Sequence, residues 1–330
     1  MLQLKNNTPF SAKIALFPNE QGIDMLYTLV KGSFNLAEQL TLCAEQPAPQ
    51  MEDVYYGKPG QSSLQYAADF HPGKHSTDVL MLGQACAPSQ QAVYHLDVQL
   101  QLGALHKVVR VFGNRVWQGG SISQPELFTR MPLVYEKAFG GLDIQGDALR
   151  GGEARNPVGV GFRGKKSASQ LDGTPLPNLE CPKQLIQDTT DTPEPAAFGP
   201  RAPNWQPRLQ FAGTYDQAWQ TTRAPYLPDD YSPRFMNVAH PNLIAPGFLQ
   251  GGEPIKIIGM HPMGEIISQV PYVKLAAIVE VAGQTQPAAF NLETILLEPN
   301  QLRMSLVWKA AFPCDKKALK ISQVTVNLAR

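Results

Sequence analysis

Charge of either sign is scarce in this chain. Only 17% of its 330 residues are charged, against roughly 25% in an average globular domain. The 28 Lys and Arg residues balance the 28 Asp and Glu residues, so the formal net charge is zero. A chain without net charge has no general attraction for nucleic acid or for an anionic membrane. We therefore expect neither of them as a partner.

Cysteines and long apolar runs are also scarce. Cys43, Cys86, Cys181 and Cys314 are far apart and form no CxxC pair, so free thiols in a reducing compartment are expected. Residues 1–7 contain no apolar core of a signal peptide. No stretch approaches the roughly 18 apolar residues of a membrane-spanning helix. The sequence thus predicts a cytoplasmic protein.

Glycine and proline are abundant. The chain has 27 glycines and 29 prolines, more than long helices tolerate, and these residues predict many turns. The fold class expected is mainly β, with antiparallel sheets in a sandwich- or barrel-like arrangement, few short helices and a long ordered Gly/Pro-rich insertion. We expect an N-terminal β unit over residues 1–150, an irregular connection over 151–210 and a C-terminal β unit over 211–330. A single integrated domain is the alternative.

The clearest strands lie in the first half of the chain. Between Tyr94 and Leu102 every second residue is apolar, which is typical of a strand with one wet face. The dipeptide Gly103-Ala104 then predicts a two-residue hairpin loop. Residues 106–112 would form the second strand, and residues 115–117 the third strand of an antiparallel meander.

Other expected elements are shorter. Further strands are predicted at residues 23–29, 78–82 and 304–308. Over residues 319–328 the apolar positions change phase, and a bulge near Ser322-Gln323 would restore one apolar face. Capping-box patterns predict the starts of two short helices, over residues 123–126 and 214–217.

Residues 159–164 form a literal GxGxxG motif. A nucleotide site of this type needs a strand before the glycines and a helix after them, because the helix N-terminus binds the phosphate. Neither element is evident here, since Asn156-Pro157 precedes the motif and Ser167 follows it. We interpret the motif as glycine-rich loop geometry and expect no cofactor.

Metal and catalytic sites are weakly indicated. His71 and His75 lie near Asp69 and Asp78, but His71 begins a His-Pro-Gly turn and no second ligand cluster is visible, so no metal site is expected. The GxSxG and HExxH motifs are absent. The enzymatic alternative is a β-fold hydrolase or carbohydrate-active enzyme. It would use carboxylates such as those of Asp78, Asp97 or Glu136.

Aromatic residues and arginines gather between residues 205 and 235. These residue types are enriched in the hot spots of protein interfaces. They are equally the types that close a core beneath a loop. An interface and a core are therefore both open interpretations of this group.

An ordered series of short motifs resembles one known family along nearly the whole chain. The most specific motif is Met-Pro-Leu-Val-Tyr-Glu-Lys-Ala-Phe-Gly-Gly at residues 131–141. Further motifs follow in order at residues 156–162, 176–180, 198–200, 212–216 and 251–253. The series resembles the uncharacterised-domain family found beside the spike and effector genes of bacterial type VI secretion systems.

The resemblance implies a non-catalytic adaptor or chaperone. Such a protein binds an effector (a toxin) and assists its loading onto the spike protein or its PAAR tip. A structural component of the spike is another possible role. Family motifs and hot-spot chemistry coincide at six expected partner-binding residues, which are Tyr135, Phe139, Trp205, Tyr215, Trp219 and Arg234.

Overall fold

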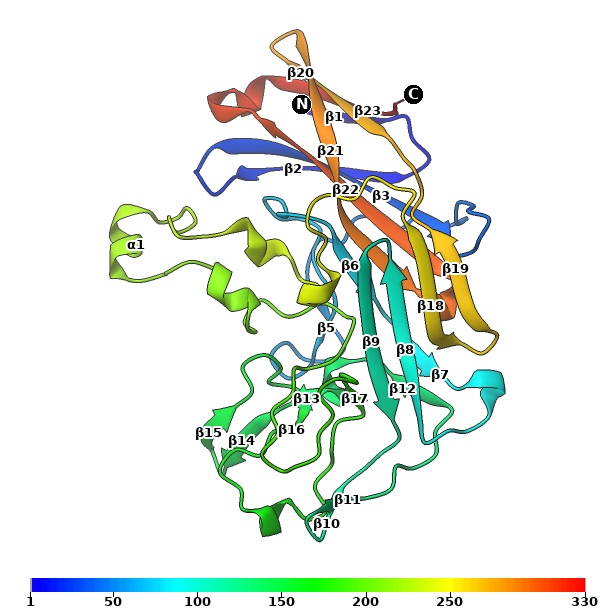
Figure 1. Ribbon diagram of the computed structural model, residues 1–330. Coiled ribbons are helices and arrows are strands. Elements are labelled where there is room, and N and C mark those ends of the chain that lie inside the picture. The colour runs from blue at the N-terminus through cyan, green and yellow to red at the C-terminus, as the bar shows by residue number, and fades with distance from the viewer. Residues whose placement is uncertain (1, 330) are drawn as a thin grey trace.

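Two β-sheets form the frame of the protein, and the computed structural model describes residues 2–329 (Figure 1). The larger sheet has eight strands. They lie in the order β1 (Gln3–Asn6), β23 (Ile321–Leu328), β20 (Leu275–Val281), β21 (Gln284–Glu298), β22 (Arg303–Pro313), β3 (Asp24–Asn35) and β2 (Ser11–Pro18), with β6 (Asp78–Met81) beside β21. Strands β1 and β2, at the two ends of this order, contact each other, so the sheet is nearly closed and barrel-like.

The smaller sheet has five strands. Their order is β17 (Leu179–Glu180), β9 (Leu105–Phe112), β8 (His95–Leu102), β18 (Pro254–His261) and β19 (Gly264–Gln269). Both sheets combine strands from residues 1–150 with strands from residues 211–330. The predicted mainly β class is confirmed.

The central strands of the larger sheet are buried on both faces. In β3 the run from Tyr27 to Val30 is buried without alternation, and in β22 the run from Met304 to Ala310 is buried in the same way. A strand that is covered on both faces needs a nearly continuous apolar sequence. The covering segments are remote in sequence, since Lys31 of β3 lies 3.6 Å from Asp69 and the backbone of Met81 bonds to Phe198.

The predicted hairpin is confirmed. Leu102 pairs with Leu105 across the loop, where Gly103 has a positive φ of 53°. The predicted third strand is wrong, because β10 (Trp117–Gln118) pairs with β11 (Ser121–Ile122) and β17 occupies the free side of β9. The chain leaves the sheet at Gly113, which packs so closely on the carbonyl of Glu126 that a side chain has no room.

The bulge in the last strand is also confirmed. Opposite β23, Glu280 pairs with Gln323 and Val281 pairs with Ile321, so Ser322 is the extra residue. The insertion lets Ile321 and Val324 both face the core, although they are three positions apart.

Helices are few and short, and only one of the two predicted starts forms a helix. Helix α1 (Gln217–Thr222) is capped by Asp216 and not by the predicted Thr214. The carboxylate of Asp216 accepts a bond from the Trp219 amide. Residues 123–126 are not helical, because Ser123 instead extends the β10–β11 hairpin: its hydroxyl accepts a bond from the Val116 amide.

The glycine motif lies in a packed loop rather than in a strand–loop–helix unit. Strand β16 (Val160–Gly161) pairs in parallel with β13 (Phe139–Gly140). The following residues form the 3-10 turn η3 (Ala168–Leu171). This loop geometry brings the motifs at residues 131–141 and 156–162 together.

Candidate functional site

The structure divides the six expected partner-binding residues into two groups. Tyr135, Phe139 and Trp205 are buried, and the rings of Tyr135 and Trp205 pack edge to face at 5.2 Å. All three side chains act as core residues beneath the central irregular region. Tyr215 and Arg234 are exposed, and Trp219 is half-buried.

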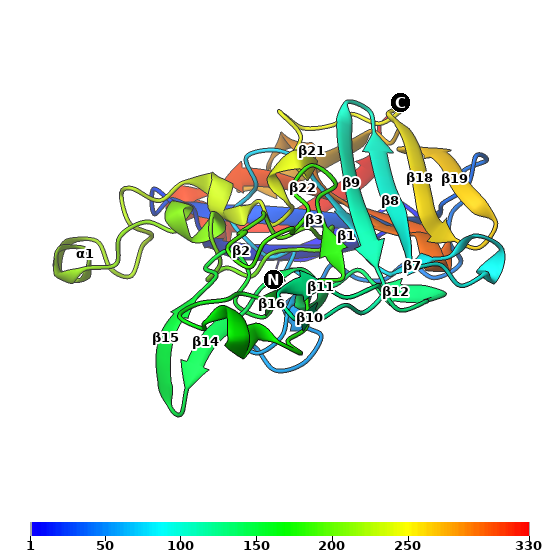
Figure 2. The ribbon, with the colours of Figure 1, turned by 60° about the horizontal axis from the view of Figure 1, so that its bottom comes forward.

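Tyr215 and Trp219 lie on a projecting segment, residues 212–232, which we call the arm. Its tip is α1, which stands away from both sheets in two views (Figure 1 and Figure 2). Arg234 lies at the base of the arm in η5 (Pro233–Met236), with its guanidinium 5.9 Å from the ring of Phe211.

The arm is internally bonded. The indole Nε1 of Trp219 donates to the carbonyl of Tyr226 over 2.9 Å, and its ring packs against that of Tyr215 at 4.7 Å. Across the base, the amide and hydroxyl of Thr214 both donate to Asp230. These bonds hold the exposed aromatic side chains in a defined arrangement.

The arm is anchored to the larger sheet at the turn between β2 and β3. The guanidinium of Arg223 donates to the carbonyl of Glu20 over 2.6 Å. The ring of Tyr226 covers Gly22, where an added Cβ would lie 3.1 Å from the ring. Tyr215 and Tyr226 remain 53% and 42% exposed. An aromatic surface therefore stands beside the turn between β2 and β3.

Strand β2 ends the hydrogen-bonded order of the larger sheet, and its outer edge is unpaired although β1 contacts the strand. It pairs along its whole length with β3, and within the described residues no strand is hydrogen-bonded to its other side. An unpaired edge presents a row of backbone donors and acceptors to another chain. Leu16 on this strand is exposed, as is Ile23 at the turn.

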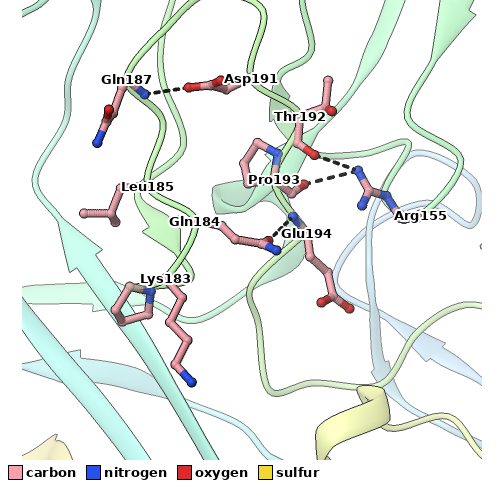
Figure 3. Close-up of a pocket in the computed structure, with 10 residues that line it drawn as sticks. Arg155, Lys183, Gln184, Leu185, Gln187, Asp191, Thr192, Pro193 and Glu194 are labelled. Carbon is pink, nitrogen blue, oxygen red and sulfur yellow. Dashed lines mark hydrogen bonds between the residues drawn. The ribbon is translucent and has the colours of Figure 1, made fainter.

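A second feature is a polar cleft in the irregular region. Figure 3 shows its outer cavity, about 670 Å³, which is lined by Arg155 and residues 182–194. Arg155 forms a bidentate pair with Glu153, at 2.7 and 2.6 Å, and also donates to the carbonyls of Thr192 and Pro193. Arg155 therefore fixes the course of the segment that forms the wall.

Glu194 stands where this cavity meets a second one of about 450 Å³. Its carboxylate lies 3.1 Å from Nε2 of buried His240, whose Nδ1 accepts from the Asn242 amide. The close approach of His240 Nε2, then the charges of Lys107 and Arg155, hold the pKa of Glu194 at about 2. Burial lowers the pKa of His240 to about 4, so at neutral pH the imidazole is uncharged and Glu194 is ionised.

The candidate catalytic carboxylates do not converge. Asp78 is fully buried and accepts from Lys74 Nζ at 2.7 Å. Asp97 is bound in a bidentate pair by Arg110, whose bonds lower its pKa. Glu136 accepts from the amide and hydroxyl of Ser63. Each carboxylate is engaged in a separate bonding network.

The two histidines considered for a metal are also separated. His71 is buried against Lys309, whose Nζ bonds to the His71 carbonyl at 2.9 Å and lies 3.0 Å from Glu293. His75 is exposed. Over residues 2–329 no group of three His, Cys, Asp or Glu side chains is placed to hold a metal ion.

Sequence reasoning missed four titratable residues of the cleft, which are Lys107, Arg201, Glu194 and His240. A signal existed for Lys107 alone, because it continues the inward row of Val109 and Val111 in strand β9. A lysine in an apolar row indicates a buried charge. The other residues come from irregular segments, where no periodicity indicates which side chains point inward.

No helix among the described residues is long and apolar enough to span a bilayer. Comparison with curated proteins and with solved structures finds no match. A family model described as an uncharacterized protein conserved in bacteria, DUF2169, matches residues 21–309. Because that match spans most of the chain, this protein belongs to the uncharacterised bacterial family DUF2169.

Proposed function

We propose that this protein is a non-catalytic adaptor that binds a type VI effector in the cytoplasm of the producing cell. It would assist loading of the toxin onto the spike protein or its PAAR tip. The type VI assignment rests on the resemblance of the ordered motifs. The binding role is supported by one structural observation, which is the exposed aromatic arm at the β2–β3 turn, where the unpaired edge strand β2 ends.

Strand addition is the binding mode that this arrangement supports. An extended segment of the effector would pair with β2, and its side chains would contact Tyr215 and Tyr226 on the arm. Main-chain bonds to a sheet edge give affinity, while neighbouring side chains give specificity. Exposed, preorganised tyrosines provide contact area at a low cost in conformational entropy.

The alternatives have less support. A hydrolase would need acids that converge on one cavity, whereas Asp78, Asp97 and Glu136 lie in separate networks. A structural spike component would be found in the secreted fraction. The adaptor is expected to remain with the producing cells.

The test is co-purification with the effector encoded beside this gene. Replacing Tyr215 with Ala should weaken the complex about 30-fold, as expected for an interface hot spot. The melting temperature should stay unchanged, because Tyr215 is exposed. Tyr272→Ala is the matched control, since Tyr272 is also exposed but lies between β19 and β20.

Two outcomes would contradict the proposal. One is that no effector co-purifies and its secretion is unchanged when this gene is deleted. The other is that Tyr215→Ala and Tyr272→Ala bind the effector as the wild type does, which would remove the arm from the interface.

A further inference from the structure

A buried lysine without a partner lines the cleft. Lys107 is 7% exposed, because it lies on the inward face of β9. Among residues 2–329, no atom forms a hydrogen bond or an ion pair with its Nζ. The side chain borders the cavity of about 450 Å³. A buried ammonium group is unfavourable unless an anion compensates it. Glu194 borders the same cavity but forms no ion pair with Lys107 among the described residues, so the cleft has room for a further anion beside the ammonium group.

Two further buried donors lie deeper in the same cleft. The Tyr135 hydroxyl and Arg201 Nε have no hydrogen-bond partner among the described residues. They line an inner cavity of about 20 Å³, large enough for one water molecule or one ligand oxygen. Glu194 and His240 border both this cavity and the larger one.

The cleft carries one excess positive charge. Asp97 at its rim is neutralised by Arg110, and histidine is counted as neutral. The remaining charged side chains are four cations and three carboxylates, namely Lys107, Arg155, Lys183, Arg201, Glu153, Asp191 and Glu194. One net charge suits a monoanion such as a carboxylate better than a doubly charged phosphate.

The shape of the cleft favours a ligand longer than one side chain. The two larger cavities share Pro182, Lys183 and Glu194, so they lie side by side along the segment that Figure 3 shows. Val108, Pro195 and Ala196 add apolar wall around Lys107. Apolar walls with a few convergent polar groups are typical of sites for extended ligands.

We propose that this cleft binds a carboxylate group of an extended polypeptide segment, with Lys107 as the cation that receives it. The inference rests on the proposed function in one respect, which is that the polypeptide is the effector bound by the adaptor. The carboxylate is either an acidic side chain or a chain terminus, and both present the same two oxygens to the ammonium group.

Three labelled peptides test the proposal by fluorescence anisotropy. The first alternates Ala and Glu with both ends capped. The second has Gln in place of Glu, and the third is this Gln peptide with a free C-terminal carboxylate. The wild type should bind the Glu peptide or the free-carboxylate peptide about tenfold more tightly than the capped Gln peptide, as expected for a charge-assisted bond. Which of the two binds identifies the source of the carboxylate.

Substitution at the lysine assigns the preference to this site. Lys107→Met should abolish the tenfold preference, whereas Lys58→Met, at an exposed lysine outside the cleft, should retain it. Lys107→Gln gives the same readout if the methionine variant does not fold. Equal binding of all three peptides, or a preference that survives at Lys107→Met and Lys107→Gln, would overturn the inference.

The peptide result is independent of the adaptor test. If the effector co-purifies but the peptides show no carboxylate preference, the cleft inference fails and the adaptor proposal stands. If no effector co-purifies, the adaptor proposal fails, and the peptides still decide whether the cleft binds carboxylates.

Discussion

At the scale of single residues, Asn156 explains why the most specific motifs occur together. Its Nδ2 donates to the carbonyls of Tyr135 and Phe139, at 2.8 and 2.9 Å, and the residue is fully buried. The side chain thus joins two motifs that are separate in the sequence. Tyr135 and Phe139 are buried core residues whose backbone carbonyls accept these bonds, a long-range contact that no local property of the sequence indicates.

Replacing Asn156 with Ala should destabilise the fold. The change leaves buried carbonyl groups without their donor, which costs about 1–3 kcal/mol in the free energy of unfolding. Urea unfolding measures the change. Asn291→Ala, at an exposed asparagine of β21, should stay within about 0.5 kcal/mol of the wild type. Equal stability of the two variants would show that Asn156 does not hold the motifs together.

At the scale of elements, local pairings were predictable from the sequence and remote ones were not. The β8–β9 hairpin needs only a two-residue loop between alternating segments, so both strands and their register followed from the sequence. The third strand failed because the neighbour of β9 is Leu179–Glu180, a two-residue strand within an irregular segment. Such short strands carry no periodicity.

The bulge in β23 makes an unusual prediction about deletions. Removing Ser322 should be tolerated, because Ile321, Val324 and Val326 would then alternate regularly and keep their inward face. Removing Thr325 instead would turn Val326 outward, since a shift by one residue reverses every later side chain. Exposing this valine should cost about 1.5–3 kcal/mol.

Urea unfolding of the two deletion variants provides the comparison. Stability near that of the wild type is expected for the Ser322 deletion, and a clear loss for the Thr325 deletion. A larger loss for the Ser322 deletion would mean that the bulge has a role beyond correcting the phase.

At the scale of the whole molecule, buried lysines couple stability to alkaline pH. Burial lowers the pKa of Lys107 and Lys309 to about 8, from the ordinary value of 10.5. Between these values the unfolded chain holds protons that the folded chain has released. Each lysine should therefore add to the free energy of unfolding as the pH rises, by up to about 1.4 kcal/mol per pH unit.

Urea unfolding at pH 7.5, 8.5 and 9.5 tests this expectation. The wild type should gain stability relative to Lys107→Met across this range. Comparing the two proteins is necessary because burial raises the pKa of Cys43, Cys86 and Cys314, which titrate with the opposite sign in both. Parallel pH profiles of the two proteins would mean that folding does not lower the pKa of Lys107.

The sequence predicted only part of the site, because it does not show which side chains are covered by segments that are remote in the chain. The sequence placed aromatic residues and arginines in the central region, but both interface and core remained open for them. Trp205 became core and Tyr215 stayed exposed. Which outcome applies to each residue depends on segments that pack from far along the chain, and one sequence does not show that packing.

The order of the larger sheet also has a consequence for biosynthesis. Strand β3 pairs with β22, and β1 pairs in parallel with β23, so strands from opposite ends of the sequence lie together (Figure 1). At a translation rate of roughly 5–20 residues per second, about 13–54 s separate the synthesis of β3 from that of β22. During that interval β3 of the nascent β2–β3 hairpin has no partner strand on its other side. The sheet must therefore assemble late, once residues 303–328 have left the ribosome.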